Sequence, residues 1–218
     1  MTTESAHVYW DAEWQKADGA SKWARAEAEV MDHAATLPAG ARVLDLGAGI
    51  GRHALALARM GMRVSALDAS AQSGKVIGLA AQAAGLEIDT RQGAMTELPF
   101  DDGAFDHVLS WNVIYHGDEA VVARTLAEVR RVLRPGGTFL ATMLSARRLP
   151  VEQAKAPGRE ISPRTWVFDG EGDKVHPHYF CDAARLVALL EGFEMLQLED
   201  RVHDSPGSWH WHLLAERL

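Results

Sequence analysis

The sequence predicts an α/β fold, in which a doubly wound, mostly parallel sheet carries helices on both faces. Three observations predict it. The apolar run Val43–Leu46 leads into the turn Gly47-Ala48-Gly49-Ile50-Gly51, an Ala/Leu-rich helix follows to Met60, and a second apolar run, Arg63–Leu67, stops at Asp68. A strand, a helix and a second strand in this order form a βαβ unit, whose two strands are parallel.

Length and composition predict one soluble domain. The 218 residues are 47% hydrophobic and 24% charged, and no apolar run approaches the length of a membrane span. The first seven residues lack the basic and apolar regions of a signal peptide, so we expect a cytoplasmic protein without membrane contact. The single cysteine, Cys181, excludes an internal disulfide.

The charge balance predicts the class of partner. A formal net charge of -8 opposes docking on a phosphate backbone, so we expect a small-molecule substrate and no nucleic acid. The sequence does not predict an oligomeric state.

The glycine-rich turn predicts a ligand site at the end of the first strand. Glycine lets a ligand approach the backbone closely, and the following helix directs free N–H groups at it. Asp68 can accept hydrogen bonds from both hydroxyls of a ribose. The glycines stand at 47, 49 and 51 and Arg52 follows, which is the wrong spacing for the G-x-G-x-x-G fingerprint of a dinucleotide site. The spacing therefore argues against an NAD-dependent dehydrogenase, and a glycine-rich turn without any ligand is the alternative.

Asp45-Leu46-Gly47-Ala48-Gly49-Ile50-Gly51 together with Asp68 resembles motifs I and II of the class I S-adenosylmethionine (SAM)-dependent methyltransferases. The resemblance spans roughly residues 40 to 145. The stretch 93–110 resembles the third and fourth motifs, and 132–137 (VLRPGG) resembles a structural signature that follows the core. The resemblance implies a Rossmann-like sheet of seven strands in the order 3-2-1-4-5-7-6, and it implies SAM as cofactor.

The resemblance also implies the site residues. Glycines of the turn would approach the methionine part of SAM, Asp68 would hold the ribose, and Met95 would flank the adenine, where Ala94 replaces an acid that family members often carry. The expected cofactor-binding residues are Tyr9, Trp14, Asp45, Gly47, Ala48, Gly49, Gly51, Arg52, Asp68, Ala69, Ala94, Met95 and Trp111. The expected substrate-binding residues are Asn112, Tyr115, His178 and Tyr179.

The remaining elements follow in chain order. Residues 1–38 predict an irregular aromatic segment followed by a helix from Trp23 to Leu37. This region either pins the terminus to the core or forms a helical lid over the cofactor. Residues 39–144 form the expected SAM-binding core. Apolar spacing, caps and breakers there predict helices near 70–85 and 118–133 and strands near 87–92, 105–110 and 138–143.

The last third of the chain divides into two parts. Residues 145–177 lose hydrophobic periodicity and collect prolines and glycines, which predicts a long loop, either an insertion that covers the substrate or a solvated excursion. Residues 178–218 predict a helix over 181–191 and two strands, 193–199 and 209–216, that form a hairpin at the sheet edge.

The histidines suggest the chemistry. His116 follows the central strand, where open α/β sheets bind ligands, and its side chain type titrates near neutrality, so it is the candidate catalytic base. A histidine packed at a helix start is the alternative. His176, His178, His203, His210 and His212 raise the possibility of a metal, but no Cys or carboxylate is arranged with them in sequence, so no metal is predicted.

The sequence therefore predicts a single-domain SAM-dependent methyltransferase acting on a small molecule. A metalloid or thiol methyltransferase resembling the tellurite-resistance group and a catalytically silent SAM-binding module are the alternatives.

Overall fold

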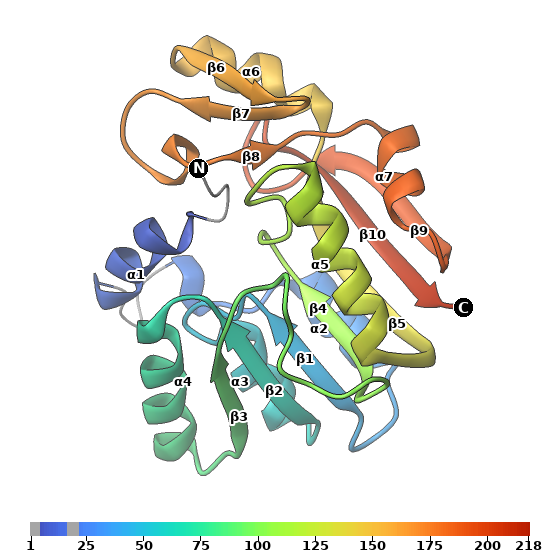
Figure 1. Cartoon of the computed structure of the whole chain (residues 1–218). Coiled ribbons are helices and arrows are strands. Elements are labelled where there is room, and N and C mark those ends of the chain that lie inside the picture. Colours follow the sequence, from blue (N-terminus) through green and yellow to red (C-terminus); the bar gives the residue numbers. More distant parts are fainter. Residues whose placement is uncertain (1–4, 17–21) are drawn as a thin grey trace.

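The computed structural model describes residues 5–16 and 22–218, and its centre is a seven-stranded sheet with the order β3-β2-β1-β4-β5-β10-β9 (Figure 1). The five neighbouring strands β3, β2, β1, β4 and β5 are parallel to one another, and β10 runs antiparallel to both β5 and β9. The doubly wound fold and the strand order expected from the sequence are confirmed. The strands are β1 (Arg42–Leu46), β2 (Arg63–Asp68), β3 (Ile88–Gln92), β4 (Phe105–Ser110), β5 (Leu133–Leu144), β9 (Phe193–Val202) and β10 (Trp209–Arg217).

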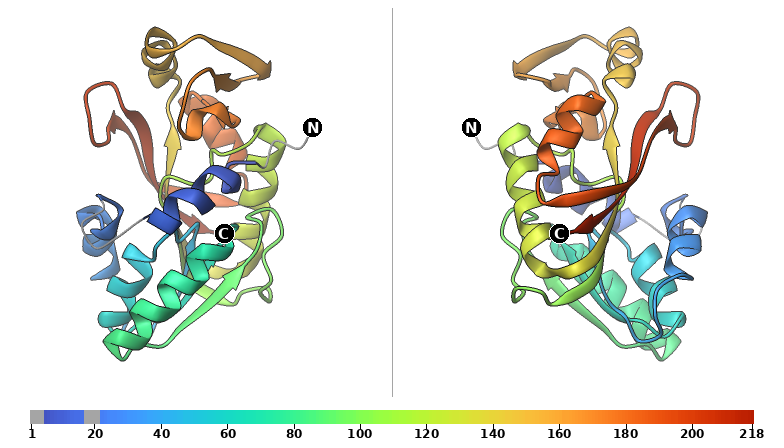
Figure 2. Two further views of the ribbon diagram at one scale, coloured as in Figure 1. Left: turned by 90° about the vertical axis from the view of Figure 1, so that its left-hand side faces the viewer. Right: turned by 90° about the vertical axis from the view of Figure 1, so that its right-hand side faces the viewer.

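Helices cover both faces of the sheet, because β1 alternates its apolar side chains between two cores (Figures 1 and 2). Val43 packs in one cluster with Val30 and Leu57, whereas Leu44 and Leu46 belong to the other cluster, which includes side chains of α5 and α7. The helices of the core are α2 (Ala28–Ala34), α3 (Arg52–Arg59), α4 (Ala71–Ala84), α5 (Glu119–Val132) and α7 (Ala183–Leu189).

Capping residues fix the ends of these helices. Ser70 and Asp118 each precede a helix in extended conformation, and their side chains accept hydrogen bonds from Gln72 N–H and Val121 N–H respectively. Gly85 ends α4 with a φ of 66°, a left-handed conformation that favours glycine.

The N-terminal segment differs from the sequence prediction. Its aromatic residues form a regular helix, α1 (His7–Lys16), instead of an irregular stretch, and a 3₁₀ turn (Lys22–Ala24) precedes α2. The expected helix from Trp23 is therefore shorter and begins at Ala28, after Glu27 in extended conformation. Aromatic residues are permitted in helices, and here the ring contacts among Tyr9, Trp10 and Trp14 and the burial of Trp14 outweigh their weak intrinsic preference.

Residues 145–179 are also more regular than predicted. They form a 3₁₀ turn (Ala146–Arg148), α6 (Leu149–Lys155) and a three-stranded antiparallel sheet with the order β6-β7-β8, at the top of Figure 1. The strands are β6 (Gly158–Ser162), β7 (Thr165–Phe168) and β8 (His178–Tyr179), with a 3₁₀ turn (Asp173–Val175) before β8. The strands are too short for their alternation to be read from the sequence, and the prediction of a structureless loop is wrong.

Smaller differences concern the ends of elements. β5 begins at Leu133 and includes the Arg-Pro-Gly-Gly stretch that was expected to separate it from α5, because Leu133 already pairs with Phe105. α7 is two residues shorter at each end than predicted, and β9 is three residues longer. Among the described residues, no helix is both long enough and apolar enough to cross a membrane.

Candidate active site

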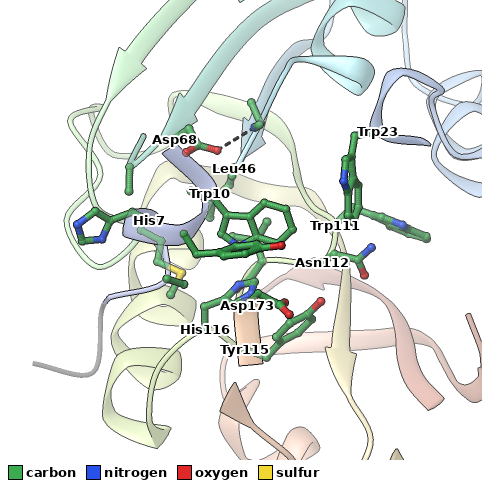
Figure 3. A pocket seen from close by; sticks show the side chains of 18 of the residues that line it. His7, Trp10, Trp23, Leu46, Asp68, Trp111, Asn112, Tyr115, His116 and Asp173 are labelled. Atoms are coloured by element: carbon green, nitrogen blue, oxygen red, sulfur yellow. Dashed lines mark hydrogen bonds and ion pairs between the residues drawn. The ribbon is translucent and has the colours of Figure 1, made fainter. Parts of the chain in front are cut away.

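A cavity of about 830 Å³ lies where β1, β2 and β4 end and the turns after them begin (Figure 3). Carboxyl ends of parallel strands are where open α/β folds bind ligands. α1 lies along one side of the cavity, Arg148, Asp173 and Lys174 border another, and the β9–β10 hairpin borders a third. A volume in this range fits a cofactor together with a small second molecule.

The glycine turn forms one end of the cavity. Gly47 and Gly49 have φ values of 77° and 56°, the left-handed region that glycine adopts without strain. A Cβ on Gly47 would overlap the Val113 side chain, and a Cβ on Gly49 would lie 2.9 Å from the Trp14 ring. The turn therefore leaves no room for a side chain, and its backbone faces the cavity.

Asp68 connects the end of β2 to this turn. Its carboxylate accepts hydrogen bonds from Gly49 N–H and Ser70 N–H, both at 2.8 Å. Burial raises the pKa of Asp68, and the two backbone hydrogen bonds partly offset this effect. A carboxylate offers about four acceptor positions, so two remain for hydroxyl donors from the cavity that it lines.

Asp45 and Gly51 lie behind the turn and do not line the cavity. Asp45 is buried and accepts a hydrogen bond from Ala54 N–H at 3.0 Å, and burial raises its pKa to about 7. Gly51 caps α3 with a φ of 81°, and a Cβ there would meet Ile77. Both positions support the shape of the turn. Arg52 does line the cavity, and it pairs with Glu27 at 2.9 Å.

Aromatic side chains of α1 lie over the turn. Trp14 stacks on Trp10, with ring centroids 4.8 Å apart, and Tyr9 lies edge-on to Trp10. Tyr9, Trp10 and Trp14 all line the cavity. The Trp14 indole N–H is buried and finds no hydrogen-bond acceptor among the described residues, so it is available to a ligand. α1 is held by Asp11, whose carboxylate accepts from the Ser70 hydroxyl at 2.7 Å.

The other expected cofactor residues also reach the cavity. Ala69, Ala94, Met95 and Trp111 line it, together with the glycine turn residue Ala48. The Trp111 indole N–H is a second buried donor with no acceptor in the described part of the chain. These positions were found from contiguous sequence motifs, and the structure brings them together.

The opposite end of the cavity is built from the segment after β4. Asn112 has a φ of 64°, a strained conformation for a residue other than glycine, and such outliers gather at functional sites. Thr142 and His203 hold its side chain through hydrogen bonds at 3.2 and 3.1 Å. Tyr115 and His116 also line the cavity, and burial raises the pKa of the Tyr115 hydroxyl.

His116 is buried, with its Nδ1 2.7 Å from the Val113 carbonyl oxygen. Its Nε2 makes no hydrogen bond within the described residues and lies 3.7 Å from Asp173 Oδ2. Burial raises the pKa of Asp173, but the neighbouring His116, His178 and Lys174 side chains outweigh this effect and keep that pKa well below its usual range.

The two other expected substrate residues lie behind this end of the cavity and do not line it. His178 is fully buried, and its Nε2 lies 3.3 Å from Asp173 Oδ2. Tyr179 points away, because its hydroxyl donates to Glu119 on α5 at 2.5 Å.

Several cavity residues were not predicted from the sequence. Their segments are separated in the chain and show no motif: Trp10, Trp23, His53, Arg148, Asp173, Lys174, His203 and His210. His203 and His210 were noted only as possible metal ligands. Burial lowers the pKa of His203 to about 4 and that of His210 to about 2, so both are neutral at pH 7.

Comparison with known proteins agrees with this arrangement. Residues 43–137 match a family described as "Methyltransferase domain". A protein of Xanthomonas campestris named "Ubiquinone biosynthesis O-methyltransferase" is 35% identical over 195 residues, which cover 86% of this chain and 77% of that protein. The "Sarcosine/dimethylglycine N-methyltransferase" of Halorhodospira halochloris is 31% identical over 173 residues, which cover 75% of this chain but only 55% of that protein.

A solved structure shares the fold. It is a Burkholderia thailandensis 1,6-didemethyltoxoflavin N1-methyltransferase, crystallised with 1,6-didemethyltoxoflavin and S-adenosylhomocysteine. The two structures superpose with a TM-score of 0.68 and 21% identity, over 96% of this chain and 88% of that one.

Proposed function

This chain belongs to the class I SAM-dependent methyltransferases, and we propose that it transfers a methyl group from SAM to a small-molecule acceptor. One observation carries the proposal. The glycine turn and Asp68, joined by the Gly49 N–H hydrogen bond, form one end of the cavity, and the segment 112–116 forms the other. A donor and an acceptor can therefore lie end to end in one space.

SAM fits the residues at the glycine end. When bound, it supplies a methyl group activated on a sulfonium. Asp68 would accept from the ribose hydroxyls, the backbone of Gly47 and Gly49 would contact the amino-acid part, and Met95 would pack on the adenine. Trp14 would cover the site, and its unpaired indole N–H is a donor within reach of the turn.

The chain's own residues then position and desolvate the acceptor. Methyl transfer is an in-line displacement, in which an acceptor lone pair forms the new bond while the donor's C–S pair returns to sulfur. Tyr115, Trp111 and the α1 aromatics exclude water from this space, and Asn112 presents its amide at the wall. A protonated acceptor must also lose a proton, and we propose His116 Nε2 as the base that takes it.

The environment of His116 supports this role. Nδ1 lies beside a carbonyl oxygen, which accepts only, so Nδ1 carries the proton and Nε2 offers its lone pair. Asp173 beside Nε2 would stabilise the imidazolium that forms.

We also propose a cytoplasmic setting. On the grounds of the net charge of -8, we propose that there is no nucleic-acid partner. The acceptor is a small molecule, as the names of the relatives suggest, and its reacting atom is to be found by experiment.

The test is a screen with methyl-labelled SAM against pooled metabolites grouped as amines, phenols, thiols and metalloid oxyanions. The proposal predicts labelled product in one pool, and the pool identifies the acceptor atom. Binding of SAM without any labelled product would favour the silent SAM-binding module.

A further inference from the structure

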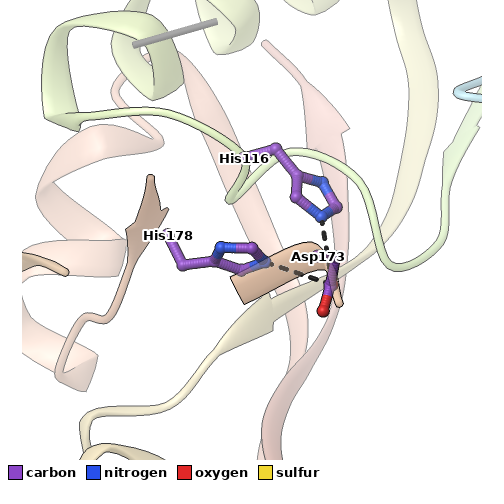
Figure 4. A group of neighbouring side chains, drawn as sticks. All are labelled: His116, Asp173 and His178. Carbon is purple, nitrogen blue, oxygen red and sulfur yellow. Dashed lines mark hydrogen bonds and ion pairs between the residues drawn. The ribbon is translucent and has the colours of Figure 1, made fainter. Parts of the chain in front are cut away.

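Three side chains that the sequence did not connect meet at the acceptor end of the cavity: His116, Asp173 and His178 (Figure 4). Backbone pairing brings the two histidines together, because His116 and His178 face each other in an antiparallel bridge. Tyr179 N–H donates to the Tyr115 carbonyl at 2.9 Å and Gly117 N–H to the Pro177 carbonyl at 3.0 Å. Asp173 reaches the pair from the 3₁₀ turn before β8.

Both imidazoles direct Nε2 toward the carboxylate, because Nδ1 of each ring lies beside a backbone carbonyl. Nδ1 of His116 lies 2.7 Å from the Val113 carbonyl, and Nδ1 of His178 lies 2.8 Å from the His176 carbonyl. A carbonyl accepts only, so each Nδ1 carries a proton, and each Nε2, once deprotonated, presents a lone pair to a metal ion. Metal-ligating histidines characteristically donate their other N–H to a carbonyl or carboxylate in this way.

The carboxylate of Asp173 faces the Nε2 atoms of both histidines. Its Oδ2 lies 3.3 Å from His178 Nε2 and 3.7 Å from His116 Nε2, and its Oδ1 lies 3.8 Å from Lys174 Nζ. His116 is only 8% exposed and its Nε2 has no hydrogen-bond donor or acceptor among the described residues. Two imidazole nitrogens and one carboxylate oxygen that face one another are stabilised by a cation between them, either a proton, as in the His178–Asp173 hydrogen bond, or a metal ion.

We propose that His116, Asp173 and His178 bind a divalent transition-metal ion such as Zn²⁺ or Fe²⁺. Two imidazoles and one carboxylate are the donor set of catalytic zinc sites and of non-haem iron sites, both of which keep open positions. The three ligand atoms lie within 4.8 Å of one another. Ligands about 2.0–2.2 Å from a tetrahedral zinc are roughly 3.3–3.6 Å apart, so small side-chain movements close the site.

The second histidine group, His203, His210 and His212, does not have this character. The Nε2 atoms of His203 and His210 already face donors, because Asn112 Nδ2 lies 3.1 Å from His203 Nε2 and Arg148 Nη1 lies 3.2 Å from His210 Nε2. It therefore serves as a matched control for the proposed site.

The open positions of the metal face the cavity, because His116 and Asp173 line it. An acceptor oxygen, nitrogen or sulfur can coordinate there, and the metal would lower its pKa. The Nε2 lone pair of His116 cannot bind a metal and a proton together, so in the metal-bound protein this histidine acts as a ligand and not as the base.

The test measures metal binding to the full chain without SAM or acceptor, so it does not depend on methyl transfer. The chelator-treated protein is titrated with Zn²⁺ and with Mg²⁺ by calorimetry, and the metal content after dialysis is measured by mass spectrometry. The variants are Asp173→Asn, which keeps the shape but weakens the ligand, His178→Ala, and His203→Gln in the second histidine group.

The proposal predicts that the wild type and His203→Gln each bind one equivalent of Zn²⁺ and do not prefer Mg²⁺. Asp173→Asn and His178→Ala should bind Zn²⁺ at least about 100-fold more weakly. If His178→Ala does not fold, Asp173→Asn decides alone. No Zn²⁺ binding in the wild type, undiminished binding in folded Asp173→Asn, or loss of binding in His203→Gln would each overturn it.

Discussion

The two ends of the cavity are built in different ways. The glycine end comes from one continuous stretch, residues 45–68, in which strand, turn, helix and strand follow directly. The acceptor end is assembled from the segment after β4, the 3₁₀ turn at Asp173, β8 and the β9–β10 hairpin, which lie up to about 90 residues apart, as the Asn112–His203 hydrogen bond shows. The difference teaches that the cofactor end is a local property of the sequence, whereas the acceptor end is a property of the fold.

The largest effect is expected at the acceptor end. His116→Ala should lower kcat/KM by about 10²–10⁴-fold while the Kd for SAM holds, because it removes a group near the acceptor and none at the glycine turn. Steady-state kinetics and calorimetry measure the two quantities. His33→Ala, a partly buried histidine on α2 outside the cavity, is the control. Full activity in a folded His116→Ala protein would remove His116 from the mechanism.

Next in size is Gly49→Val at the glycine end. The new Cβ would lie 2.9 Å from the Trp14 ring, and valine would be forced to a φ near 56°. Overpacking and left-handed strain together should cost roughly 2–5 kcal/mol, divided between folding and SAM binding. Gly78→Ala, on α4 with open space at its Cβ, is the control for folding. Unchanged SAM affinity and melting temperature would show that the turn tolerates side chains.

Asp68→Ala should weaken SAM binding by about 1.5–3 kcal/mol, the range for hydrogen bonds to a charged group. The Gly49 and Ser70 N–H groups also lose their acceptor, so a lower melting temperature should accompany the change. Asp68→Asn keeps one acceptor oxygen, so its SAM affinity and melting temperature should lie between those of the wild type and Asp68→Ala. A change in Kd of less than twofold would place the cofactor elsewhere.

The two ends should also respond to pH in opposite directions. Burial lowers the pKa of His210 to about 2, so below its ordinary value of 6.5 the unfolded chain binds a proton that the folded chain does not, and stability falls as pH falls. His210→Gln should therefore reduce the slope of unfolding free energy against pH by about 1.4 kcal/mol per unit between about pH 4 and 6. Denaturant unfolding across this range measures it, with the exposed His7→Gln as control, and an unchanged slope would contradict burial of a neutral ring.

Behind the glycine turn the sign is reversed. Burial raises the pKa of Asp45 to about 7 from 3.8, so the folded protein holds a proton that the unfolded chain has lost, and stability falls as pH rises through this window. Asp45→Asn, whose amide oxygen can still accept from Ala54 N–H, should flatten that fall by about 1.4 kcal/mol per unit between about pH 4.5 and 6.5. The same fall in the variant would indicate that Asp45 is ionised in the folded protein.

The difference between the two ends also explains what the sequence could predict. The strands, helices and the positions of Gly47, Gly49 and Asp68 follow from local signals: apolar runs, caps and glycine spacing. The strand order and the role of Met95 were implied by the family resemblance of these local motifs. Asp173 and Lys174 lie in a segment without periodicity, and nothing in their neighbourhood in sequence indicates that β8 pairs with the segment after β4. The α1 helix was missed for a related reason, because its aromatic residues are stabilised by tertiary packing and not by helical propensity.

The substrate-side residues show the same limit. His178 and Tyr179 were expected at the cavity because they follow the insertion, yet strand alternation within β8 directs Tyr179 to Glu119 and His178 to Asp173. Their side-chain directions depend on the backbone bridge to His116, which only the fold provides.

The central claim is that the glycine end binds SAM and not a dinucleotide, and calorimetry tests it most directly. The purified chain is titrated separately with SAM, S-adenosylhomocysteine and NAD. The account predicts saturable binding of SAM and S-adenosylhomocysteine at one site per chain, weakened by Asp68→Ala, and no binding of NAD. Binding of NAD with no binding of either SAM species would contradict it.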